Sequence, residues 1–217
     1  MLRDYQSYAL KKIIENDRSF LFWPRQTGKD YIISKFLEQF VNDNSDSAIL
    51  YICDYKNHIH WYRDKLINNI HNCVRRSSEF EIKFIKNNRL IFCSIDDDFF
   101  ELTRGLNTKI IIYNDAYRER NFGLLKNFIY STGCKCIFAS WQISTKMMDV
   151  IDSNDNFYVN VMICANPDAL NADFKINKDI VNYFKYKKKE MFDYMNKSFQ
   201  RKRKLQKLNE VEDEIKL

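Results

Sequence analysis

Residues 22–30 read FWPRQTGKD and stand between a short apolar run, Ser19–Trp23, and a segment with helical periodicity. Six apolar residues define one face of that helical segment: Ile32, Ile33, Phe36, Leu37, Phe40 and Val41. A strand, a glycine–lysine turn and a helix in this order predict a phosphate-binding loop. In such a loop, backbone N–H groups at the helix N-terminus face the anion and the lysine neutralises phosphate oxygens. The predicted nucleotide-binding residues of the loop are Gln26, Thr27, Gly28, Lys29 and Asp30.

Two positions of the loop depart from the general phosphate-loop pattern. Trp23 stands where the first glycine is expected, and Asp30 replaces the Ser or Thr that follows the lysine. The alternative interpretation is an ordinary strand-to-helix turn with a solvated lysine.

The rest of the chain alternates between apolar runs and amphipathic segments. We expect helices at 4–16, after the loop, at 58–74 and near 123–130, and strands at 19–23, 48–53, 80–85, 90–95, 109–113, 135–139 and 157–164. Residues 86–88 fit a hairpin turn. This alternation predicts an α/β fold, a mostly parallel sheet sandwiched by helices. We expect one domain over residues 1–165 and a basic, helical C-terminal extension over 166–217.

Composition sets the broad class of the chain. Among 217 residues, 45% are hydrophobic and 15% aromatic, which excludes an intrinsically disordered chain. The six cysteines form no CxxC pair and no run is long enough to cross a bilayer, so we expect an intracellular protein that is neither secreted nor membrane-bound. The net charge of +6 is concentrated late in the sequence, where Arg201, Lys202, Arg203 and Lys204 form a cluster. This cluster is a candidate nucleic-acid contact, and the alternative is a solvated helix face.

The chain resembles the ATPase domain of terminase large subunits, the DNA-packaging motors of tailed phages and herpesviruses. The resemblance rests on the opening Leu2–Gln6 (LRDYQ), on Arg25–Lys29 (RQTGK) and on the order of the motifs downstream. An Arg–Gly pair precedes the strand 109–113, that strand ends in Asn114-Asp115-Ala116 where the family has Asp-Glu-Ala, and Ser140 follows the next strand. The match covers roughly residues 2–145. The resemblance implies a RecA-like P-loop NTPase fold, and the family's nuclease domain has no room here.

The resemblance also implies roles for individual residues. Tyr5 and Gln6 would contact adenine, Lys29 the phosphates of ATP, and Arg25 would sense the γ-phosphate. In this family the residue after the lysine and the first acidic residue of the second motif hold Mg²⁺, and a following glutamate orients water. Asp30, Asn114 and Asp115 stand at these places.

These substitutions leave several functions open. The first is a packaging-motor ATPase that acts on double-stranded DNA, with portal, nuclease or small terminase subunits as partners and a homo-oligomeric ring as the assembly, at a site of virion assembly or in the host cytoplasm. The second is a catalytically inactive descendant that serves as a structural or regulatory interaction module. A superfamily 2 helicase relative is a third, although it requires a second RecA-like lobe.

One acidic run has a local explanation. Asp96-Asp97-Asp98 precedes Phe99-Phe100-Glu101-Leu102, and we expect a helix N-cap there in preference to a metal cluster.

Overall fold

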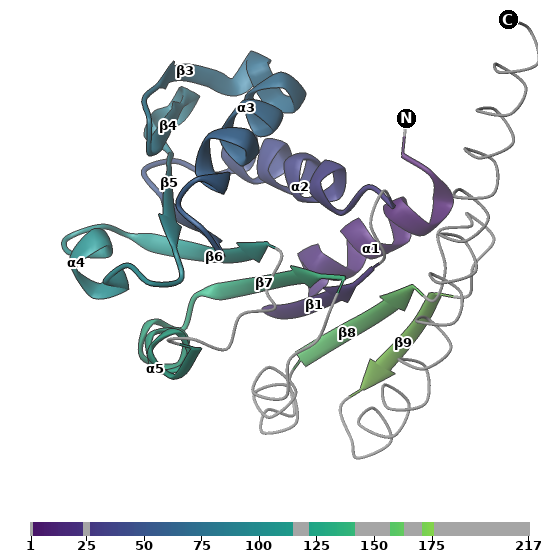
Figure 1. Cartoon of the computed structure of the whole chain (residues 1–217). Coiled ribbons are helices and arrows are strands. Elements are labelled where there is room, and N and C mark those ends of the chain that lie inside the picture. Colours follow the sequence, from purple (N-terminus) through teal and green to yellow (C-terminus); the bar gives the residue numbers. More distant parts are fainter. Residues whose placement is uncertain (1, 24–26, 115–121, 142–156, 163–170, 176–217) are drawn as a thin grey trace, which may run out of the picture. The chain divides into compact units, whose positions relative to one another are not determined.

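A computed structural model describes residues 2–23, 27–114, 122–141, 157–162 and 171–175, which fall in a compact unit spanning Met1–Asn177. Its centre is a nine-stranded sheet of order β3-β4-β5-β2-β6-β7-β1-β8-β9 (Figure 1). The strands are β1 Arg18–Phe22, β2 Ala48–Cys53, β3 Val74–Ser77, β4 Glu81–Phe84, β5 Arg89–Ser94, β6 Thr108–Asn114, β7 Lys135–Ser140, β8 Phe157–Met162 and β9 Asn171–Lys175. In this spatial order, the six neighbouring strands β5, β2, β6, β7, β1 and β8 run parallel to one another. The strands at both edges of the sheet pair antiparallel with their neighbours.

Helices cover both faces of the sheet (Figure 1). The α-helices are α1 Asp4–Glu15, α2 Lys29–Asp43, α3 His58–Ile70, α4 Phe99–Thr103 and α5 Phe122–Thr132, with short 3-10 turns η1 His71–Cys73 and η2 Ile85–Asn87. The largest core cluster joins α1, α2 and α3 to one face of the sheet, where Ile49, Tyr51 and Cys53 of β2 point. Leu50 and Ile52 are also fully buried and point to the other face, because strand side chains alternate. A strand buried on both faces explains the unbroken apolar run of β2.

Most predicted elements are confirmed, and the exceptions lie where the sequence pattern is weak. The helix expected over 58–74 ends at Ile70, and Val74–Ser77 instead form the edge strand β3. Three of the four β3 residues are exposed, so this strand carries no apolar alternation that could reveal it. The strand β9 lies beyond the boundary expected after residue 165 and pairs with β8, which extends the sheet to Lys175. The expected N-cap is confirmed: the Asp98 carboxylate accepts from the N–H groups of Phe100 and Glu101 at 3.0 and 3.2 Å.

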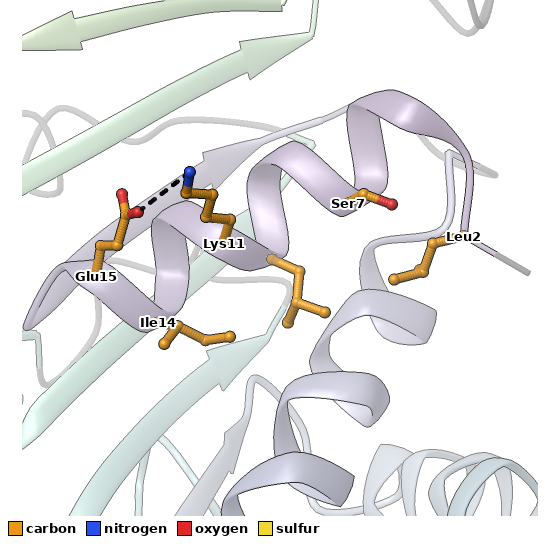
Figure 2. Close-up of a pocket in the computed structure, with 6 residues that line it drawn as sticks. Leu2, Ser7, Lys11, Ile14 and Glu15 are labelled. Atoms are coloured by element: carbon orange, nitrogen blue, oxygen red, sulfur yellow. Dashed lines mark ion pairs between the residues drawn. The ribbon is translucent and has the colours of Figure 1, made fainter.

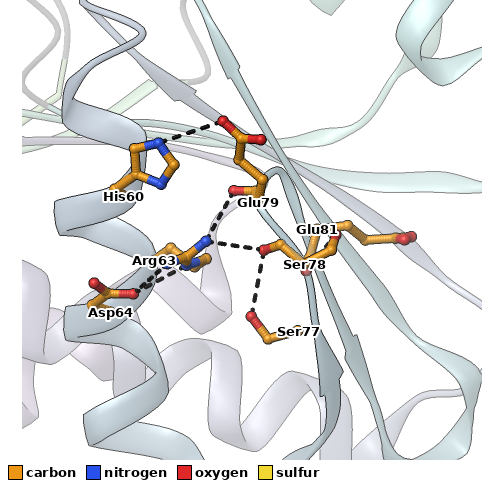
Figure 3. A network of polar contacts seen from close by, with 7 residues as sticks. All are labelled: His60, Arg63, Asp64, Ser77, Ser78, Glu79 and Glu81. Carbon is orange, nitrogen blue, oxygen red and sulfur yellow. Dashed lines mark hydrogen bonds and ion pairs between the residues drawn. The ribbon is translucent and has the colours of Figure 1, made fainter.

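Polar contacts connect α3 to the turn between β3 and β4 (Figure 3). The Arg63 guanidinium donates to the Ser78 carbonyl at 3.2 Å and pairs with the neighbouring Asp64, while His60 lies 3.5 Å from Glu79. Exposed pairs of this kind contribute little individually. Together they connect one side of α3 to this turn.

Candidate nucleotide site

The carboxyl ends of three neighbouring parallel strands form the edge at which the expected loop begins. In the sheet register, Phe22 of β1 lies opposite Ser140 of β7, and Ala139 of β7 lies opposite Asn114 of β6. The Trp23 N–H donates to the Ser140 carbonyl at 2.9 Å, which extends the pairing of β1 with β7 by one residue. Ligands of open parallel sheets bind at this edge.

Gly28 ends the loop and is the N-cap of α2. Its φ of +89° is in the left-handed region, which favours glycine. A Cβ added here would stand 2.4 Å from the Gln6 Nε2, so any other residue would both have an unfavourable backbone angle and displace the end of the Gln6 side chain. Because glycine brings no side-chain oxygen to the first-turn N–H groups of α2, they remain suited to an anionic ligand.

The two α1 residues expected at adenine hold the loop. The Tyr5 hydroxyl donates to the Thr27 carbonyl at 3.0 Å, and the Gln6 side-chain amide donates to the same oxygen at 3.2 Å. Gln6 is buried, and its own carbonyl oxygen accepts from the Arg3 N–H at 3.0 Å. These contacts fix the backbone just before Gly28, and the contact with adenine stays a prediction.

Lys29 is the first residue of α2 and is buried, with 8% exposure. Its ammonium donates to the Trp23 carbonyl at 3.2 Å, so it points back across the loop toward the end of β1. Trp23 is fully buried, and its ring meets the Tyr5 ring edge-on at 5.5 Å. Lysine side chains are rarely buried to this extent.

Asp30 and Asn114, two of the predicted metal ligands, contact each other directly. The Asn114 amide donates to Asp30 Oδ1 at 2.6 Å and to the Tyr51 hydroxyl at 2.8 Å. Asn114 is fully buried, and only its NH₂ group can face the Asp30 carboxylate, because the amide oxygen would be repelled. The other Asp30 oxygen pairs with the Lys65 ammonium of α3.

Sequence reasoning missed Tyr51 and Lys65. Tyr51 lies in the middle of an apolar strand and Lys65 on the polar side of a helix, so neither has a local motif. The only available signal was indirect: an acid placed beside a phosphate loop implies a cationic partner.

Several predicted residues lie outside the described part of the chain: Arg25, Gln26, Asp115 and the cluster Arg201, Lys202, Arg203 and Lys204. Arg104, from the Arg–Gly pair before β6, is described and is exposed. It precedes the start of β6, whereas Asn114 ends that strand, so Arg104 lies at the opposite edge of the sheet from the loop.

The described residues at the expected metal position do not fit Mg²⁺ as they are arranged. Mg²⁺ requires oxygen ligands in near-octahedral geometry. Here an amide NH₂ faces one Asp30 oxygen and an ammonium faces the other. A divalent ion at Asp30 would have to displace the Lys65 ammonium and would lie against the Asn114 N–H groups.

A separate hollow of about 310 Å³ lies along α1 (Figure 2). Its lining residues are Leu2, Ser7, Leu10, Lys11, Ile14 and Glu15. None of them belongs to the loop at Thr27–Asp30, so this hollow is distinct from the candidate nucleotide site.

Solved structures identify the fold. No protein-family model matches the sequence, and no curated protein matches it. The chain is similar to the large terminase from a thermophilic bacteriophage, with a TM-score of 0.55 and 11% identity over 73% of this chain and 45% of that one. It is also similar to the large terminase ATPase domain of Thermus phage P74-26 (TM-score 0.50, 10% identity, 69% of this chain and 74% of that one). A mutant of that domain gives a TM-score of 0.52 and 10% identity, over 64% of this chain and 65% of that one.

The fold is therefore that of a phage large terminase ATPase domain, which confirms the expected α/β, RecA-like class. The chain spans 45% of the large terminase from the thermophilic bacteriophage and 65% of the mutant ATPase domain. Among the described residues, no helix is long and apolar enough to cross a membrane.

Proposed function

We propose that this chain binds ATP at the junction of β1 and α2 and acts as the ATP-binding component of a terminase-type DNA-packaging motor, or of a divergent relative of one. The observation that carries the proposal is Lys29: a buried ammonium at the N-terminus of a 15-residue helix, directly after a left-handed glycine. A triphosphate supplies the negative charge that this arrangement favours.

The groups around the loop have separate roles in the proposed binding. The first-turn N–H groups of α2 donate to phosphate oxygens, and Lys29 neutralises their charge. Tyr5 and Gln6 keep the Thr27 carbonyl turned toward α1 and away from the anion, because both donate to it. Arg25 senses the γ-phosphate and Asp115 orients water, as the resemblance implies.

Calorimetry of ATP binding, with and without Mg²⁺, tests the proposal. Wild type is compared with Lys29→Ala and with Lys35→Ala, which removes another α2 lysine that pairs with Glu38 at 2.6 Å. We expect Lys29→Ala to weaken binding by about a hundredfold and Lys35→Ala to bind like wild type. No binding by folded wild type in either buffer would contradict the proposal.

A packaging role adds double-stranded DNA and further subunits as partners. The basic cluster 201–204 is proposed to contact DNA phosphates, portal, nuclease or small terminase subunits are proposed partners, and a ring of identical chains is the proposed assembly. Replacing all four basic residues with Gln removes up to four phosphate contacts, which would lower the salt dependence of DNA binding by about 0.9 in slope per lost contact. Unchanged DNA binding would remove the cluster from the interface.

The second candidate function is a catalytically inactive interaction module. Asp30 favours it, because both carboxylate oxygens are already bound by Asn114 and Lys65. Phosphate release with and without duplex DNA separates the two: turnover that depends on Lys29 supports the motor, and ATP binding without turnover supports the module.

A further inference from the structure

We propose that the Lys65 ammonium takes the place of the divalent cation at this site, so that the chain binds nucleoside triphosphate without Mg²⁺. This inference rests on the proposed nucleotide binding. It concerns which positive charge accompanies the phosphates, and not whether they bind.

The acidic group of this site stands on the helix and not at the end of the strand. The usual site has a hydroxyl on the helix and a carboxylate at the strand end, whereas here the carboxylate is Asp30 on the helix and the strand end is the amide of Asn114. The pair therefore carries one negative charge in both arrangements. In this chain, that charge has moved into the first turn of α2, next to Lys29, where the helix dipole favours it.

Both oxygens of the Asp30 carboxylate are contacted by donors of the protein. Left unneutralised, a carboxylate beside a triphosphate would oppose binding by charge repulsion. Lys65 pairs with one oxygen of Asp30, and Asn114 donates to the other at 2.6 Å. The Lys65 charge thus cancels that of Asp30, so that no divalent ion is needed to offset this carboxylate.

The Lys65 ammonium also contacts an aromatic ring in addition to Asp30. Its ammonium lies 4.4 Å from the centroid of the Trp61 ring, one helical turn earlier on α3. A cation over an aromatic face is stabilised by the ring quadrupole. Trp61 itself is 55% exposed, so its ring is open to this contact. The stacked ring limits the freedom of the lysine and keeps its charge at Asp30.

The test compares ATP binding in excess EDTA with binding in excess Mg²⁺, using the full chain. Wild type is expected to bind with affinities that differ by less than about threefold between the two buffers. Lys65→Met is expected to lose about tenfold or more of its metal-free affinity, the size of one lost charge-assisted contact, and to regain part of it with Mg²⁺.

Lys35→Met is the matched control. Like Lys65, Lys35 pairs with a carboxylate, that of Glu38, and lies over an aromatic ring, that of Tyr31, at 5.8 Å. It differs from Lys65 in lying farther along α2, away from Asp30. Its removal should leave both affinities unchanged. A triple variant restores the usual chemistry: Asp30→Thr, Asn114→Asp and Lys65→Met together should make binding depend on Mg²⁺.

The outcomes separate the inference from the proposed function. Binding by wild type only when Mg²⁺ is present overturns the inference and leaves the nucleotide site standing. No binding in either buffer refutes the proposed function itself. Since the wild-type comparison needs no variant, the test holds even if Lys65→Met does not fold.

Discussion

Two halves of the candidate site differ in how far they follow the general phosphate-loop pattern. The anion half, defined by Thr27, Gly28 and Lys29, has the left-handed glycine, the helix N-terminus and the buried lysine that phosphate binding requires. The cation half, defined by Asp30, Lys65 and Asn114, has an ion pair and an amide where metal-binding oxygens are expected.

The difference shows which requirements are backbone requirements. Binding phosphate depends mainly on N–H groups whose direction is fixed by a helix and a glycine, and few side chains can replace these. Neutralising charge depends only on where a positive charge stands, and a lysine from another helix can supply it. The second half can therefore change while the first is retained.

The largest expected effect comes from removing the lysine of the anion half. Lys29→Ala should weaken ATP binding by about a hundredfold, since a charge-assisted contact of about 3 kcal/mol is lost. Calorimetry measures this, with Lys35→Ala as the control. If both variants bind equally well, the anion half does not contact the nucleotide.

The next effect comes from adding charge to the cation half. Asn114→Asp places a second carboxylate about 2.6 Å from Asp30 and removes the donor to it. We expect a loss of about 1–3 kcal/mol of unfolding free energy, read from urea denaturation, because a second charge is buried beside Asp30 and the hydrogen bond to it is lost.

Added Mg²⁺ sharpens that second measurement. It should recover part of the lost stability in Asn114→Asp, where two carboxylates can share the ion, and little in wild type. Equal stabilisation of both proteins would show that the cation half already takes a metal.

An effect of similar size is expected from the glycine that joins the two halves. Gly28→Ala introduces strain at positive φ and a clash with Gln6, and should cost about 1–3 kcal/mol of unfolding free energy. In a Gln6→Ala background the same change should cost less, because the clash is gone while the backbone strain remains. A double-mutant cycle of thermal or urea unfolding separates the two. Strict additivity would mean that Gln6 does not contact Gly28.

The smallest effect on unfolding free energy at neutral pH is expected from a buried cysteine of the central sheet. Burial raises the pKa of the Cys136 thiol on β7 from 9.0 to about 12. The unfolded chain loses this proton near pH 9, whereas the folded chain loses it only near pH 12. The stability that the protonated thiol contributes is therefore complete below pH 9, and it falls by about 1.4 kcal/mol for each pH unit between pH 9 and 12.

Cys136→Ala should remove that decline relative to wild type. Urea denaturation at pH 8, 9 and 10 measures the difference between the two proteins. A constant difference across these values would indicate that the thiol is accessible in the folded chain, and rapid alkylation at pH 8 would indicate the same.

The edges of the sheet show the limit of sequence reasoning for the fold. Ala48–Cys53 was predictable to the residue, because six consecutive buried positions leave an unbroken apolar run. Val74–Ser77 was not, because this edge strand has mostly exposed side chains and is specified by its pairing with β4. The same holds for Asn171–Lys175, which becomes a strand by pairing with β8.

The sequence by itself determined the strand-turn-helix order at Gly28, the class of the sheet and the departures from the general phosphate-loop pattern at Asp30 and Asn114, because each depends on residues that are neighbours along the chain. Tertiary structure alone decided what those departures mean. Lys65 is separated from Asp30 by 35 positions and Asn114 by 84, and no local pattern connects them. They meet because α2, α3 and β6 pack together, and a charge is neutralised by whatever group the fold brings within a few ångströms.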